Sequence, residues 1–156
     1  MSYEILFISF YRSLFESEAT DFGNENEKEA VDTLSVSIES RQKFKSGLIV
    51  HPALPWLGGT PDIIFIDKDG ILCTGEVKCP SSLDPFGKTP EKRLIDMDYI
   101  QQDDSGNFHL NEKHAHYFQC QLQCFLTKSP HCYFYVHSTN PENCCELKIP
   151  RADDFL

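Results

Sequence analysis

Hydrophobic positions along the chain follow two patterns, short runs typical of strands and longer stretches with helical spacing. An apolar run at 63–66 is followed by the turn residues 68–70 and by a second strand-like run at 71–78. Helical spacing occurs at 22–34, before this hairpin, and at 112–127, after it. The pattern therefore predicts an α/β chain in which a hairpin lies between two helices.

The remaining segments predict shorter elements around this hairpin. Strands are expected at 35–40, 48–51, 132–137 and 144–149. A loop is expected at 52–59, and a long loop or a loop with a short helix at 81–102, because both are rich in Pro, Gly or charged residues. A turn is expected at 103–107. Trp56 is expected to pack at the base of the first of these loops.

The length of the hairpin turn decides which residues lie opposite one another. A two-residue turn would place Asp62 opposite Val77, on the other face of the hairpin from Glu76. A three-residue turn, with Gly70 in the left-handed region, places Asp62 opposite Glu76. Lys78 then shares a face with Glu76, since side chains alternate along a strand. We predict the three-residue turn, which sets two carboxylates side by side with a lysine next along.

Two adjacent carboxylates point to a bound cation, because they repel each other unless a positive charge lies between them. Mg²⁺ takes oxygen ligands of this kind, and Asp62, Glu76 and the main-chain carbonyl of Val77 can supply them. Lys78 would orient or deprotonate the attacking water and offset phosphate charge. The group predicts metal-assisted phosphodiester hydrolysis with one or two Mg²⁺ ions, for which Mn²⁺ would substitute.

Residues 59–62, GTPD, and 75–80, GEVKCP, resemble the PD-(D/E)xK nuclease motif, in the form found in the YqaJ-like viral recombinase and lambda-type alkaline exonuclease family. The resemblance covers the chain in order from about Phe22 to His137. It implies a restriction-endonuclease-like α/β fold with a mixed central sheet of about five strands flanked by helices. We expect one nuclease domain over 1–156, with its core at about 22–150 and a poorly defined segment at 1–21.

The helix predicted at 22–34 carries a candidate metal ligand. Glu27 lies on the same edge as Ala30 and Leu34, so it is expected to point toward the core side. Gly23 and Glu27 match a Gly-x-x-x-Glu pattern of the family, whose glutamate joins the metal shell. A solvated acidic helix face is the alternative interpretation.

The helix predicted at 112–127 carries a second family element, Tyr-x-x-Gln-x-Gln, at 117–121. The resemblance implies that its first glutamine, Gln119, reaches the active site, where an amide can hold the water or a phosphate oxygen. Gln121 is predicted to contact substrate. The helical spacing also predicts a buried stripe of Ala115, Phe118, Leu122, Phe125 and Leu126.

Charge is unfavourable for a nucleic-acid-binding protein. The formal net charge is −10, which opposes electrostatic binding of DNA. Local basic residues matter more than the total, and Lys43 and Lys45 lie in a basic patch at 41–45. We predict that these two lysines and Ser81 contact substrate. The charge favours a weak or assisted DNA binder over a tight one.

Seven cysteines, an odd number without a regular spacing, indicate reduced thiols and an intracellular protein of the cytoplasm or nucleus. His116, Cys120 and Cys124 have a spacing that could bind zinc, but no fourth ligand stands out, so buried thiols are preferred. The apolar run 5–10 is too short to span a bilayer and follows an acidic residue. We therefore expect neither a membrane anchor nor a signal peptide.

By resemblance, the expected activity is 5′-to-3′ exonuclease digestion of linear duplex DNA in recombination or in viral or mobile-element DNA processing. Relatives form rings, which implies a homotrimer, and a single-strand annealing recombinase is an expected partner. Two alternatives remain open. One is a structure-specific endonuclease or resolvase on the same core. The other is a non-catalytic DNA-binding or assembly module, against which the intact Asp62, Glu76 and Lys78 argue.

Overall fold

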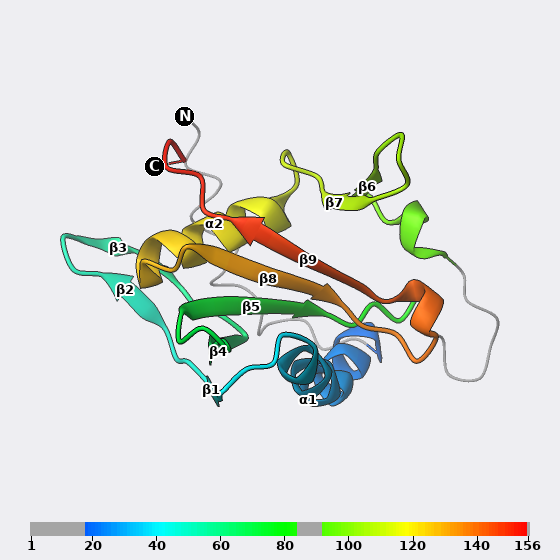
Figure 1. Ribbon diagram of the computed structural model, residues 1–156, viewed down its shortest axis with the longest axis horizontal. Helices are drawn as coiled ribbons and strands as arrows, with labels where there is room; N and C mark the ends of the chain where they lie inside the picture. The colour runs from blue at the N-terminus through cyan, green and yellow to red at the C-terminus, as the bar shows by residue number, and fades with distance from the viewer. Residues whose placement is uncertain (1–17, 84–91, 156) are drawn as a thin grey trace.

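A computed structural model describes residues 18–83 and 92–155, as an α/β chain (Figure 1). The helices within these ranges are α1 (Glu18–Ser37) and α2 (Ala115–Thr127), with short 3₁₀ turns at Leu94–Asp96 and Pro141–Asn143. The strands are β1 (Gln42–Phe44), β2 (Ile49–His51), β3 (Leu54–Gly59), β4 (Ile63–Ile66), β5 (Leu72–Lys78), β6 (Ile100–Gln102), β7 (Phe108–Leu110), β8 (His131–Val136) and β9 (Cys145–Pro150).

The central sheet has five strands in the order β1-β4-β5-β8-β9. β5 and β8 are parallel, whereas the other neighbours are antiparallel. A parallel pair needs a crossover connection, and α2 lies in the crossover between these two strands. The mixed five-stranded sheet flanked by helices confirms the predicted fold class.

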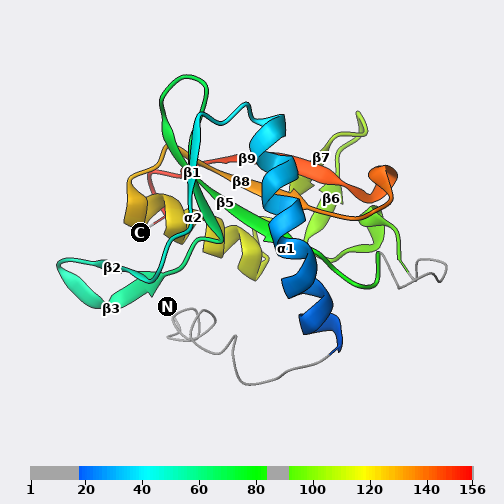
Figure 2. The same ribbon diagram turned by 90° about the horizontal axis from the view of Figure 1, so that it is seen from below.

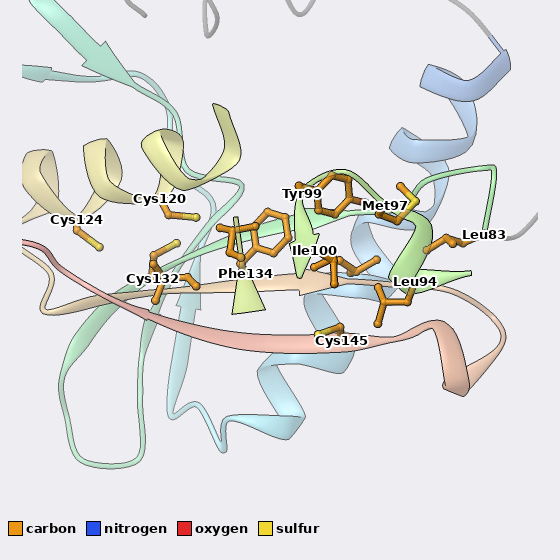
Figure 3. Close-up of a cluster of buried hydrophobic side chains, with 13 residues drawn as sticks. Leu83, Leu94, Met97, Tyr99, Ile100, Cys120, Cys124, Cys132, Phe134 and Cys145 are labelled. Atoms are coloured by element: carbon orange, nitrogen blue, oxygen red, sulfur yellow. The ribbon is translucent and has the colours of Figure 1, made fainter. Parts of the chain in front are cut away.

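The two helices cover opposite faces of the sheet, as the side chains of β8 show. Phe134 belongs to one buried cluster, with Cys120 of α2, and Tyr135 belongs to the other, with Leu34 of α1. Figure 3 shows the first cluster, in which Phe134 and Cys132 lie beneath α2. Because β8 is buried on both faces, it reads as a continuous apolar run without alternation.

The predicted hairpin register is confirmed. Ile63 pairs with Gly75 and Ile66 with Leu72, which leaves a three-residue turn between Asp67 and Ile71. Gly70 has φ +82, as this turn requires. The Asp67 carboxylate also accepts hydrogen bonds from the backbone N–H groups of Asp69 and Ile71, at 2.9 and 2.8 Å, and these bonds fix the turn.

The strand predicted at 35–40 is wrong, because α1 continues to Ser37. The period-two alternation of Val36 and Ile38 suggested a strand, but Ile38 also continues a spacing of four from Ala30 and Leu34. All three pack against the sheet, whereas Val36 is 79% exposed. The helical period therefore decided the structure of this segment.

The loop predicted at 52–59 is also wrong, because β3 occupies most of it and pairs with β2. The two strands form a separate ribbon that projects beyond the central sheet in both views (Figures 1 and 2). Trp56 is 68% exposed on this ribbon and is not packed at its base. The turn at 103–107 is confirmed, and it joins β6 and β7 in a hairpin within the predicted 81–102 loop and the residues that follow.

Across the described ranges, no helix combines the length and hydrophobicity needed to cross a bilayer. The apolar run at 5–10 lies outside these ranges, so the prediction for it stays a prediction.

Candidate active site

Asp62 lies at the end of the sheet where β4 begins and β5 ends. It directly precedes the pair Ile63–Gly75, so the observed register sets it beside Glu76. Its Oδ2 atom accepts a hydrogen bond of 2.9 Å from the backbone N–H of Val77. The half-buried carboxylate of Asp62 is thus held over the end of the hairpin, as the sequence predicted.

The Glu76 side chain is fully buried and both of its oxygens accept hydrogen bonds. Lys78 Nζ donates to Oε1, and so does Gln119 Nε2, at 2.7 Å. Gln123 Nε2 donates to Oε2 at 2.7 Å. A buried carboxylate loses its hydration, and one ammonium and two amides replace it here. Glu76 and Lys78 share a face of β5, as the strand alternation predicted.

The two glutamines reach Glu76 because they lie four residues apart on one face of α2. Gln123 is 2% exposed, and its Oε1 atom lies 3.6 Å from the thiol of Cys132, which donates to it. The sequence analysis assigned no role to Gln123. The helical spacing from Gln119 was the signal that could have identified it.

A hollow of about 350 Å³ opens next to Asp62, between α1 and the start of β4. It is lined by Glu27, Lys28, Val31, Lys45, Asp62 and Ile63. Glu27 is half-buried there, so α1 brings a second carboxylate to the same space as Asp62. Glu27 therefore lies toward the core side, as predicted, and not on a fully solvated helix face.

The charges of this region act together on Cys79, which follows Lys78 and is buried. Burial, together with the negative charges of Glu27 and Asp62 and against the opposing charge of Lys78, raises the pKa of the Cys79 thiol to about 12. The same thiol senses all three groups, so they occupy one neighbourhood although they come from α1, the start of β4 and β5.

The donor set fits a hard divalent cation. Glu27 and Asp62 present carboxylate oxygens to an open hollow, and Mg²⁺ is commonly bound by one or two carboxylates with water in its other positions. Glu76 accepts three hydrogen bonds, and a carboxylate has about four acceptor positions. Across the described residues, no three His, Cys, Asp or Glu side chains form a group that could hold a metal by themselves, and this includes the zinc spacing of His116, Cys120 and Cys124 that the sequence analysis did not favour.

Gln121 does not contact this site, which makes its predicted role in substrate binding wrong. Its side chain is 1% exposed, its Nε2 donates to the Pro150 carbonyl and its Oε1 accepts from the Ala152 N–H, both at 2.9 Å. Gln121 thus joins α2 to the end of β9. Gln121 and Gln123 are both buried, and each amide is hydrogen-bonded to polar partners.

The buried stripe predicted for α2 is wrong as well. Its five members are only half-buried. The fully buried residues of α2 are Cys120, Gln121, Gln123 and Cys124. Cys120 and Cys124 are buried free thiols, as expected.

Of the other predicted substrate contacts, one is held in an ion pair and one lines the hollow. Lys43 forms an ion pair with Asp32 of α1, so its charge is already engaged. Lys45 lines the hollow, and Ser81 is half-buried in the turn after β5. At Val77 the structure records the N–H bond to Asp62, and metal binding by its carbonyl stays a prediction.

No family profile and no curated protein matches the sequence significantly. The fold is similar to the crystal structure of LHK-Exo, an alkaline exonuclease from Laribacter hongkongensis, with a TM-score of 0.63 and 22% identity over 89% of this chain and 61% of that one. The structure of LHK-Exo in complex with dAMP gives a TM-score of 0.63 and 20% identity, over 91% and 63%. The chain thus spans about three fifths of the length of these structures. The similarity establishes the fold and agrees with the resemblance that the motif indicated.

Proposed function

We propose that the protein is a nuclease, and that it acts as a Mg²⁺-dependent 5′-to-3′ exonuclease on the ends of linear duplex DNA. The observation that carries the proposal is the placement of Asp62, Glu76 and Lys78 at one end of the hairpin, in the observed register. A fold similar to that of an alkaline exonuclease supports it. So does the dAMP complex of LHK-Exo, because a deoxynucleotide is what such a reaction releases.

Glu27 and Asp62, with Glu76 and the Val77 carbonyl, would hold one or two ions. When bound, Mg²⁺ or Mn²⁺ supplies positive charge to a phosphate and a more acidic bound water. The chain's own residues complete the site. Lys78 brings its ammonium to within hydrogen-bonding distance of Glu76, where it offsets phosphate charge and orients the attacking water. Gln119 fixes Glu76 and adds no charge.

The family resemblance extends the proposal to the setting of the reaction. We propose an intracellular enzyme of recombination or of viral or mobile-element DNA processing, assembled as a ring-shaped homotrimer. A single-strand annealing recombinase would then take up the strand that digestion leaves. The similar solved structures are longer than this chain, so these features are proposed separately from the chemistry of the site.

Substrate geometry tests the exonuclease assignment. Linear duplex DNA labelled at the 5′ or the 3′ end is incubated with the protein and Mg²⁺, beside closed circular duplex and an EDTA control. Early release of the 5′ label alone, with circular DNA intact, is the expected result. Cutting of the circle would instead support an endonuclease or resolvase. Binding without cleavage in Mg²⁺ or Mn²⁺ would leave a DNA-binding module.

A further inference from the structure

The hollow beside Asp62 carries lysines as well as carboxylates. Lys28 of α1 follows Glu27 directly, and Lys45 comes from the segment after β1, yet both line the same hollow. Both lysines are exposed. The sequence analysis predicted Lys45 as a substrate contact. It assigned no role to Lys28, which lies between two glutamates in the sequence.

Lys43, close in sequence to Lys45, forms an ion pair with Asp32 of α1 and does not line the hollow. Asp32 lies one helical turn after Lys28 on α1, and it holds Lys43, two residues before Lys45. The hydrogen bond from Lys43 lowers the pKa of Asp32, and the charge of Lys28 acts in the same direction. Lys43 is therefore neutralised against α1, whereas Lys45 faces the hollow.

We propose that Lys28 and Lys45 form a phosphate-binding site for the DNA backbone at the mouth of the carboxylate hollow. The inference rests on the proposed function and deepens it by naming the groups that hold the strand. An ammonium binds phosphate as a compact point charge and does not need the planar geometry of arginine. A hollow of about 350 Å³ is at the lower end for small-molecule sites, which suits a short piece of one strand and not a duplex.

The charges of the hollow link this phosphate site to the metal. Glu27, Asp62, Lys28 and Lys45 cancel formally, so the empty hollow attracts an anion weakly. A divalent cation on the two carboxylates leaves the hollow positive, and phosphate then meets both lysines without net repulsion. DNA binding is therefore expected to strengthen when a divalent cation is present. This gives a protein of net charge −10 a local site for a polyanion.

The test is the salt dependence of DNA binding. Fluorescence anisotropy with a labelled single strand is measured from 50 to 200 mM salt, with Ca²⁺ and with EDTA, and gels confirm that the DNA stays intact. The variants are Lys28→Gln, Lys45→Gln and the double variant. The matched control is Lys68→Gln, which removes the same charge from an exposed lysine in the β4–β5 turn, at the other end of the hairpin from Asp62.

Each substitution is expected to weaken binding in Ca²⁺ several-fold and to reduce the slope of log K against log salt by about 0.7, the value for one phosphate contact on a single strand. Lys28→Arg/Lys45→Arg should retain most of the affinity, and Lys68→Gln should behave as the wild type. Equal affinity and slope in the double variant and in Lys68→Gln would overturn the proposal, and so would wild-type binding of equal strength in Ca²⁺ and EDTA.

The outcomes separate this inference from the proposed function. Lysine-dependent binding by a wild-type protein that cuts nothing would refute the nuclease and support the phosphate site. Mg²⁺-dependent cleavage combined with lysine-independent binding would support the nuclease and refute the phosphate site.

Discussion

Gln123 donates a hydrogen bond of 2.7 Å from its Nε2 atom to Oε2 of Glu76, in a part of the core that solvent does not reach. The Cys132 thiol donates to the other end of the same amide, which fixes its orientation. The buried carboxylate is thus held on one oxygen by Gln123 and on the other by Gln119 and Lys78.

Replacing Gln123 by Leu should leave Oε2 of Glu76 without a donor and destabilise the fold by about 1–3 kcal/mol. It should also lower the affinity for divalent cations, because the carboxylate loses its fixed position. Urea unfolding and isothermal titration with Mn²⁺ measure the two effects. Gln121→Leu is the control, since it removes two hydrogen bonds of a similarly buried amide that does not contact Glu76. If both variants bind Mn²⁺ equally well, Gln123 has only a structural role.

Gly75 occupies a position on β5 where a side chain does not fit. A Cβ atom there would lie 2.8 Å from both Ile63 Cγ2 and Phe65 Cε2. Gly75→Ala should therefore destabilise the protein by about 1–3 kcal/mol through overpacking beside Glu76. Gly47→Ala, with no atom within 4 Å of the added carbon, should change stability by less than about 0.5 kcal/mol. Equal denaturation midpoints for the two variants would contradict this packing.

His131, at the start of β8, should make stability fall in mild acid. Burial lowers its pKa below the ordinary value of 6.5, Lys148 adds to the effect and Asp67 opposes it. Its Nε2 atom is buried without a hydrogen-bond partner among the described residues. The unfolded chain thus takes up the proton first, so stability falls as the pH drops below about 6.5 and levels off below the folded pKa. His131→Phe should lose less stability than the wild type between pH 7.5 and 5.5 in urea titrations, and an identical loss would disprove the assignment.

The seven free cysteines should differ sharply in reactivity. Cys144 is half-buried, whereas the other six are buried. Burial raises the pKa of the Cys73 and Cys124 thiols to about 12, so few thiolates form at pH 8. Native protein should react with Ellman's reagent at one thiol rapidly and at the others slowly, and Cys144→Ser should remove the rapid phase. Rapid reaction of several thiols in the folded protein would contradict the burial of the other six cysteines.

Local chemistry predicted the hairpin well. Asp67 and Gly70 determine a three-residue turn, and that turn alone sets Asp62 beside Glu76. The end of α1 was mispredicted because Val36 and Ile38 fit a strand and Ile38 also fits a helix, and only packing against the sheet decides between them. The strand β2 was predicted, at 48–51, but its partner β3 was missed because the proline and glycines of that segment are typical of loops.

The glutamines of α2 show where patterns of polar and apolar residues fail. Such patterns place polar side chains at the surface, and Gln121 and Gln123 are buried. Their partners are far away in the sequence: Glu76 is 47 residues from Gln123, and Pro150 is 29 residues from Gln121. Burial of an amide depends on such tertiary partners, which helix periodicity does not contain.

The central claim is that Asp62, Glu76 and Lys78 form a nuclease centre, and Lys78 tests it most directly. Mg²⁺-dependent release of nucleotides from linear duplex DNA is compared for wild type and Lys78→Met. Because Lys78 pairs with the buried Glu76, Lys78→Met/Glu76→Gln is included as a variant without an unpaired buried charge, and circular dichroism confirms folding. We predict that the wild type releases nucleotides and that Lys78→Met is slower by about 10² to 10⁴. Release by folded Lys78→Met at the wild-type rate, or no release by the wild type, would contradict the account.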